Sequence, residues 1–177
     1  MKNKNLLYSL YASLFAALVF VATMVVQIPT PTGGYVNIGD CMVLLCGFVL
    51  GPIWGTIAAG IGSMLVDMMG AYIVYAPATL VIKALVALCA CVVVKLLNPI
   101  CGKNGFVAYL FASIIGEAVM VYGYFAFEAN ILGLGAGAAA GIPGNVVQAV
   151  VGVTLGTVLM VIFQKTKLIE KMLGKKD

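Results

Sequence analysis

The chain has 177 residues, of which 63% are hydrophobic and only 9% charged, and ten lysines against six acidic residues give a net charge of +4. A water-soluble domain of this size could not bury so much apolar surface. The composition therefore predicts an integral membrane protein and excludes a secreted domain, a disordered tail and a nucleic-acid-binding domain. Histidine is absent and the five cysteines form no CxxC pair, so no metal site or cofactor is expected.

Apolar runs of about 20 residues identify helices that can span a membrane. Six runs occur, separated by short polar or Gly/Pro-rich segments, at 6–28, 36–50, 53–69, 77–97, 106–127 and 145–164. We expect a single all-α membrane domain over residues 1–177, with six transmembrane helices and a basic tail at 165–177. Gly51-Pro52 separates the short second and third helices, and Asn98-Pro99 is expected to end the fourth. Within the tail, apolar residues at helical spacing predict a short amphipathic helix on the membrane surface, formed by Leu168, Ile169, Met172 and Leu173.

The lysines predict the orientation, because short cytoplasmic loops carry an excess of Lys and Arg. They precede the first run, flank the connection between the fourth and fifth, and follow the last: Lys2, Lys4, Lys95, Lys103, Lys165, Lys167, Lys171, Lys175 and Lys176. The connections at 29–39, 70–76 and 128–143 contain no lysine. With six spans, both termini are therefore expected in the cytoplasm.

Charged residues inside spans are rare and costly, so each is a candidate functional residue. Lys83, Asp67 and Glu117 fall in the outer half or near the midplane of their predicted helices. Asn145 and Gln148 are three residues apart, hence on one face of the last helix. Two interpretations remain open: a buried ion pair of Lys83 with Glu117 or Asp67, or a pocket open to the outside into which these polar side chains project.

The first outer connection, which contains Asn37, mixes stiff prolines with glycines, as expected for a lid or for a plain connector. Asp40 follows it and is expected to begin the second helix at the outer surface. Tyrosines, among them Tyr75 and Tyr122, gather near the outer loops. They suit either an anchoring belt at the membrane interface or stacking on a planar ligand.

Sequence motifs for energy use and hydrolysis are missing. The chain contains no GxxxxGK[S/T], HExxH or GxSxG, so neither a P-loop ATPase nor a hydrolase is expected, and the protein is predicted not to be an enzyme. A small bundle with an outward pocket and no energy source suits a ligand-capturing subunit that depends on partner ATPases.

The sequence resembles the substrate-binding S components of energy-coupling factor (ECF) vitamin transporters. The resemblance covers nearly the whole chain and rests on five segments: GYVNIGD at 34–40, GP at 51–52, AGIGS at 59–63 with Asp67, YAPAT at 75–79 with Lys83, and IPGNVVQ at 142–148. These segments are typical of the family and do not identify the vitamin.

The resemblance implies a multi-pass protein of the bacterial plasma membrane that captures a B-vitamin or precursor from outside, under a lid formed by the first loop. It would then associate with a membrane coupling protein and two cytoplasmic ATPases and topple to release the ligand inward. Family members dock the coupling protein through an AxxxA face on the first helix, and Ala12 with Ala16 matches that spacing. The expected substrate-binding residues are Asn37, Asp67, Tyr75, Lys83, Glu117, Tyr122, Asn145 and Gln148.

The outer half has an acidic excess and many tyrosines, which favours a neutral or weakly cationic aromatic ring such as hydroxymethylpyrimidine or pyridoxine. Riboflavin is nearly as well supported, because the pattern resembles the riboflavin-type group of the family. Pantothenate, an anion, would need an unpaired Lys83. Two other functional classes stay open: an autonomous proton-coupled secondary transporter that uses Glu117 and Lys83, and a membrane scaffold without transport function.

Overall fold

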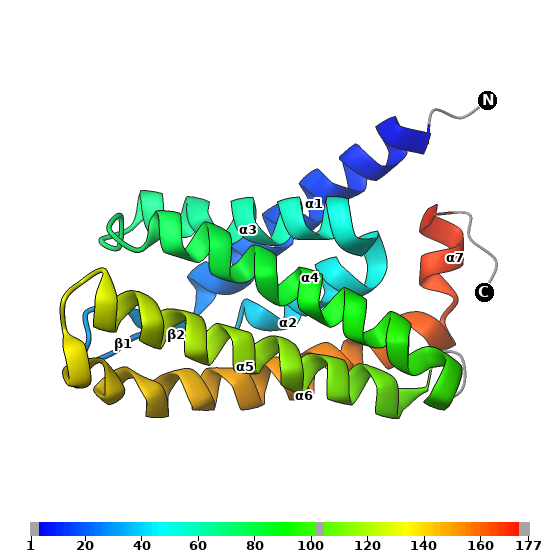
Figure 1. The fold of residues 1–177 in the computed structure, drawn as a ribbon. Coiled ribbons are helices and arrows are strands. Elements are labelled where there is room, and N and C mark those ends of the chain that lie inside the picture. Colours follow the sequence, from blue (N-terminus) through cyan, green and yellow to red (C-terminus); the bar gives the residue numbers. More distant parts are fainter. Residues whose placement is uncertain (1–3, 102–104, 174–177) are drawn as a thin grey trace.

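The computed structural model describes residues 4–101 and 105–173 and shows a bundle of long helices that run roughly along one common direction (Figure 1). Five helical segments are long and apolar enough to cross a membrane. Their helices are α1 (Lys4–Val25), α3 (Gly51–Met69), α4 (Ala76–Cys101), α5 (Phe106–Asn130) and α6 (Ile142–Lys165). Shorter elements connect them: β1 (Gln27–Pro29), β2 (Tyr35–Asn37), α2 (Asp40–Leu45), the π-helix η1 (Cys46–Leu50), the 3₁₀-helix η2 (Gly135–Gly141) and α7 (Leu168–Leu173).

The second predicted span, 36–50, differs most from the structure. Its first residues belong to strand β2, and helix begins only at Asp40. Together α2 and η1 contain 6 and 5 residues, which corresponds to about 16 Å, roughly half of a bilayer's hydrocarbon core. The chain then turns at Gly51, whose φ of +83° favours glycine, and α3 runs back through the bundle (Figure 1). This segment is therefore a half-length helix followed by a full-length one.

Other predicted boundaries need smaller corrections. The first helix ends at Val25 instead of residue 28, because Gln27–Pro29 pairs with Tyr35–Asn37 as an antiparallel strand. The fourth continues through Pro99 to Cys101, so Asn98-Pro99 does not end it. The sixth begins at Ile142, with Pro143 in its first turn, where a proline is tolerated. The short tail helix predicted from its apolar spacing is present as α7.

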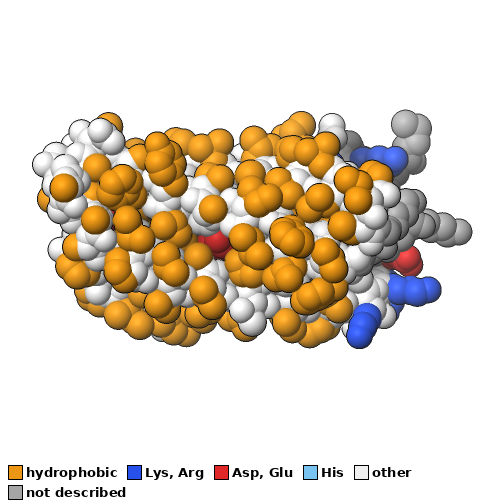
Figure 2. Space-filling model, turned by 60° about the horizontal axis from the view of Figure 1, so that its bottom comes forward, with side chains coloured by type: hydrophobic (Ala, Val, Ile, Leu, Met, Phe, Trp, Pro, Cys, Tyr) orange, Lys and Arg blue, Asp and Glu red, His pale blue; other side chains and the backbone are white. Residues whose placement is uncertain are grey.

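Both described chain ends lie at the same end of the bundle as the last turn of α4 and the first turn of α5 (Figure 1). Figure 2 shows lysines at one end of a mostly apolar surface, on which acidic side-chain atoms are visible near the middle. Large apolar side chains cover the sides of the bundle, with Leu10 61% and Ile53 68% exposed, as expected for a surface in contact with lipid. The positive end is predicted to face the cytoplasm.

Close helix packing at the centre of the bundle depends on glycine. A Cβ atom at Gly47 would lie 2.2 Å from the backbone oxygen of Ala87, and one at Gly62 would lie 2.5 Å from that of Ala16. These contacts bring η1 against α4 and α3 against α1. Small residues at such positions let helix backbones approach closely, which is the main source of packing energy between helices in lipid.

We expect Gly47→Ala to lower the free energy of unfolding by about 1–3 kcal/mol, because α4 must move away from η1 to admit the methyl group. The measurement is the thermal unfolding midpoint in detergent. Gly137→Ala is the control, because a Cβ there would meet nothing within 4 Å. Equal midpoints for the two variants would contradict the close contact.

Candidate functional site

A hollow lies beneath the β1–β2 hairpin, at the end of the bundle opposite the chain termini. Its empty space amounts to about 330 Å³ when the part open to the outside is included, so the enclosed part is small in this closed form. Residues from the hairpin and four helices line it: Thr30, Gly34, Tyr35, Asn37, Asp67, Tyr75, Thr79, Tyr124, Glu128 and Asn145. The lining therefore combines tyrosine rings with carboxylates, amides and hydroxyls.

The hairpin, residues 27–37, covers this hollow. Its turn is closed by a hydrogen bond of 2.9 Å from Thr30 N–H to the Gly34 carbonyl, with Gly33 at a φ of +88°. Glycine adopts this left-handed conformation at little cost, so Gly33 allows a short turn between the two three-residue strands. The prolines and glycines that predicted a lid thus form a compact hairpin.

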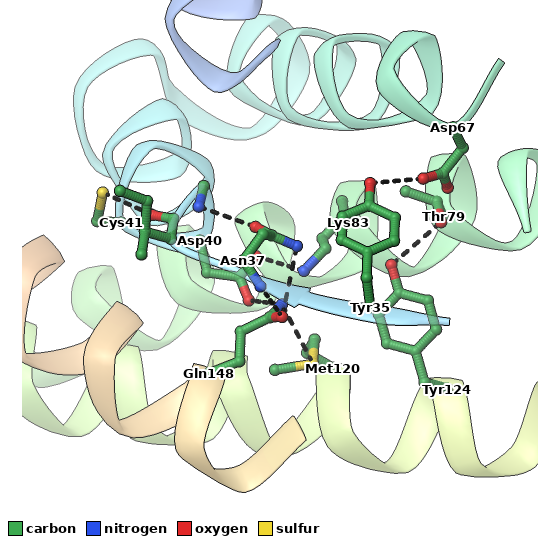
Figure 3. Close-up of polar contacts among 12 residues, drawn as sticks. Tyr35, Asn37, Asp40, Cys41, Asp67, Thr79, Lys83, Met120, Tyr124 and Gln148 are labelled. Carbon is green, nitrogen blue, oxygen red and sulfur yellow. Dashed lines mark hydrogen bonds and ion pairs between the residues drawn. The ribbon is translucent and has the colours of Figure 1, made fainter. Parts of the chain in front are cut away.

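Three hydrogen bonds attach the hairpin to three different helices. The Tyr35 hydroxyl donates to Asp67 Oδ1 on α3 at 2.6 Å (Figure 3). The Thr32 hydroxyl donates to Glu128 Oε1 on α5 at 2.8 Å. The backbone N–H of Asn37 donates to Gln148 Oε1 on α6 at 2.7 Å. These bonds hold the hairpin over the hollow, so a ligand that enters beneath the hairpin has to break them.

Two carboxylates of the lining retain hydrogen-bonding capacity. Asp67 Oδ2 and Glu128 Oε2 are buried and receive no hydrogen bond from any described residue. The first oxygen of Glu128 accepts from Thr32 and also from the Tyr75 hydroxyl, at 3.2 Å. Each buried acceptor without a donor costs stability, so both oxygens are available to donors on a ligand.

The two phenols next to these carboxylates remain protonated donors. Burial raises the pKa of Tyr75 to about 12, and the negative charge of Glu128 adds to the shift. Burial and Asp67 raise the pKa of Tyr35 well above its usual value. Since both groups prefer the neutral form in the folded protein, their hydroxyls can donate hydrogen bonds at every physiological pH.

A buried ion pair lies behind the hollow. The Lys83 ammonium on α4 contacts Asp40 Oδ1 at the start of α2 (Figure 3), and the two side chains are only 3% and 1% exposed. Gln148 Nε2 donates to the other Asp40 oxygen at 2.6 Å. The ammonium also lies 5.4 Å from the centre of the Tyr124 ring, within the range of a cation–π contact. The pair is therefore connected to the hollow through Gln148 and Tyr124.

Glu117 on α5 is the third charged residue of this cluster, with Asp40 and Lys83 as its charged neighbours. Its two oxygens accept no hydrogen bond from the described residues, and the side chain is 1% exposed. Gly152 on α6 provides the necessary space, since a Cβ there would lie 3.1 Å from Glu117 Oε1. Two carboxylates thus accompany one lysine at the centre of the bundle.

The comparisons with known proteins agree with this architecture. The family model of the ECF-type riboflavin transporter S component matches residues 5–165. The chain belongs to this family. It is 38% identical over 148 residues to an uncharacterized protein from Pyrococcus woesei, covering 83% of this chain and 95% of the relative. It also superposes on the solved S component of a bacterial ECF transporter with a TM-score of 0.61 at 19% identity, covering 95% of this chain and 97% of that one.

Membership in this family confirms the resemblance recognised in the sequence. The chain is a transporter S component, hence a substrate-binding subunit of an ECF importer, and not an enzyme. The solved structure shares the fold. Because the chain belongs to this family and has helices that are long and apolar enough to cross a membrane, it is an integral membrane protein.

The structure brings some of the predicted binding residues into the hollow and places others elsewhere. Asn37, Asp67, Tyr75 and Asn145 line it. Lys83 and Gln148 lie behind it in the Asp40 network, and Glu117 lies next to that network. Tyr122 is 71% exposed on the outer surface of α5. It lies two residues before Tyr124, about 200° around the helix, so it faces away from the hollow that Tyr124 lines.

Several lining residues were not among the expected binding residues, chiefly Tyr35, Thr79, Tyr124 and Glu128. Asp40, rather than Glu117 or Asp67, is the ion-pair partner of Lys83. The sequence interpretation placed Asp40 at the outer surface, whereas the hairpin carries the chain into the bundle before α2 begins. The signal for Tyr124 was available in the sequence, because it lies seven residues, about two helical turns, after Glu117.

Replacing Lys83 by methionine is expected to destabilise the protein by about 3–5 kcal/mol, because Asp40 would lose its only cationic partner among the described residues. The double variant Asp40→Asn/Lys83→Met removes both charges and should recover part of this loss. Thermal unfolding midpoints in detergent measure both effects. The single variant Asp40→Asn is measured alongside. If the stability loss of the double variant equals the sum of the losses of Asp40→Asn and Lys83→Met, a direct pairing is contradicted.

Proposed function

We propose that this S component captures an aromatic vitamin rich in hydrogen-bond donors, with riboflavin as the first ligand to test. The observation that carries the proposal is a tyrosine-lined hollow with two buried carboxylate oxygens, Asp67 Oδ2 and Glu128 Oε2, that accept no hydrogen bond. Hydroxyl, imide and amine groups of a ligand would supply the missing donors. The riboflavin-type family model supports the same ligand.

Aromatic rings around the hollow favour a planar ligand. Tyr35 and Tyr72 have ring centres 4.4 Å apart, and Tyr75 lies 6.5 Å from Tyr124 and 5.4 Å from Phe127. These distances are typical of favourable aromatic pairs. A planar ring that enters after the hairpin opens could stack on Tyr35 or Tyr75 while its polar edge reaches the carboxylates.

The charges of the site disfavour an anionic ligand. Two carboxylates line the hollow, and the only buried lysine of the described chain already pairs with Asp40. Pantothenate would need that lysine, so binding would have to break a buried ion pair. Hydroxymethylpyrimidine and pyridoxine remain a second group of ligands, supported by the small volume of the closed hollow and its acidic lining.

We expect Asp67→Asn and Glu128→Gln each to weaken vitamin binding by more than about tenfold, or roughly 1.4 kcal/mol, because each amide replaces a charged acceptor. Riboflavin fluorescence measures binding directly, and calorimetry measures pyridoxine and hydroxymethylpyrimidine. Tyr122→Ala is the control, because this exposed tyrosine does not line the hollow. Unchanged affinity in both carboxylate variants, with binding intact in the control, would reject the proposed site.

The family membership also supports the expected partners, a membrane coupling protein and two cytoplasmic ATPases in the bacterial plasma membrane. We also propose that the coupling protein docks on Ala12 and Ala16, although this face of α1 is covered in the present structure. Ala12 is 6% exposed, and Ala16 lies against Gly62 of α3. Use of this face would therefore require α1 to move away from α3.

Transport measurements separate this function from the two alternatives. Vesicles that contain the complete complex are expected to accumulate vitamin only when ATP is present on the side of the ATPase subunits. A protonophore should leave this uptake unchanged. Vesicles with the S component alone should bind the vitamin without accumulating it. Uptake by the isolated chain that a protonophore abolishes would favour a proton-coupled transporter, whereas absence of any vitamin binding would favour a scaffold.

A further inference from the structure

A second hollow lies at the opposite end of the bundle, where the chain termini are located. Its empty space is about 830 Å³, including the part open to the outside, and it is lined by residues of η1, α3, α4, α5, α6 and α7. None of its lining residues borders the hollow beneath the hairpin. It is therefore a separate site, and the proposed vitamin specificity does not account for it.

The walls of this hollow are apolar, but polar groups meet at one side. Lys95 and Asn98 are three residues apart on α4, and Gln164 stands near the end of α6. Asn98 Oδ1 and Gln164 Nε2 are both buried without a hydrogen-bond partner among the described residues. The side chains of Asn98 and Gln164 thus line the hollow beside Lys95, and each keeps one unpartnered polar atom just beneath the surface of the hollow.

The charge at this end of the bundle is positive. Lys165, Lys167 and Lys171 lie on or next to α6 and α7, and Figure 2 shows the lysines gathered at one end. Glu170 is the only acidic residue at this end within the described part of the chain. Basic pockets between helices at a membrane surface attract anionic lipid head groups.

We propose that this hollow binds the head group of an anionic glycerophospholipid that carries a hydroxyl, such as phosphatidylglycerol. Its phosphate oxygens would accept hydrogen bonds from Lys95. Once the two amide side chains rotate toward the hollow, Gln164 Nε2 would donate to the phosphate as well, and a head-group hydroxyl would donate to Asn98 Oδ1. The apolar walls, including Phe48, Val94 and Met160, would contact the glycerol backbone and the first carbons of the acyl chains. Ile169 of α7 borders the hollow, so lipid binding would also hold α7 against the bundle.

The test is a lipid-retention experiment with the full chain. Protein reconstituted in vesicles of equal phosphatidylglycerol and phosphatidylcholine is re-extracted in mild detergent, and native mass spectrometry identifies the lipids that remain bound. The wild type is expected to retain phosphatidylglycerol at least about fivefold better than phosphatidylcholine, and Lys95→Gln and Gln164→Glu should remove this preference. The isosteric Gln164→Glu places a negative charge next to the phosphate.

Two controls keep the result specific to the hollow. Lys165→Gln removes a neighbouring lysine that does not line the hollow and should retain the preference, as should Lys95→Arg, which keeps the charge. Equal retention of the two lipids by the wild type would overturn the proposal, as would a loss in Lys165→Gln as large as that in Lys95→Gln. Displacement of the bound lipid by millimolar inorganic phosphate would assign the site to soluble phosphate and reject the lipid.

Discussion

The ion pair between Asp40 and Lys83 is the interaction on which the outer half of the structure depends. Buried charges are costly in a bundle surrounded by lipid, so both partners must be held in place. Asp40 is the first residue of α2, and pairing with α4 requires that α2 begin deep inside the bundle. The segment before it must therefore descend from the outer end, and the β1–β2 hairpin provides this path over the ligand hollow. Non-helical backbone at such a depth is stable because protein surrounds it.

Gln148 connects this ion pair to the cover. Its amide donates to Asp40 and accepts from the backbone of Asn37, so one side chain on α6 contacts both the charge cluster and the last residue of the hairpin. Hydrogen bonds within such a buried network strengthen one another. A ligand that displaces Asn37 would consequently disturb the surroundings of Asp40, although Asp40 itself does not line the hollow.

The sequence predicted the long helices, the basic end and the polar positions of the outer half, because apolar length and charge depend on local composition. It did not predict the half-length α2, since an apolar run does not reveal where a strand replaces a helix. The partner of Lys83 was missed for the same reason. Asp40 was expected at the outer surface, whereas the hairpin carries the chain into the bundle before α2 begins at this residue. Asn37 and Asn145 could be found from polarity alone, whereas choosing Tyr124 over Tyr122 required the helical phase that Tyr124 shares with Glu117.

The hairpin that closes the hollow also has a kinetic consequence. Under the proposed function, a ligand that enters beneath the hairpin must break the contacts of the hairpin with α3, α5 and α6. If these contacts open together, the frequency of opening, rather than diffusion, would limit the association rate, and re-formation of the same bonds over a bound ligand would slow its departure. Scarce vitamins would accordingly be collected through long residence in the site instead of rapid capture.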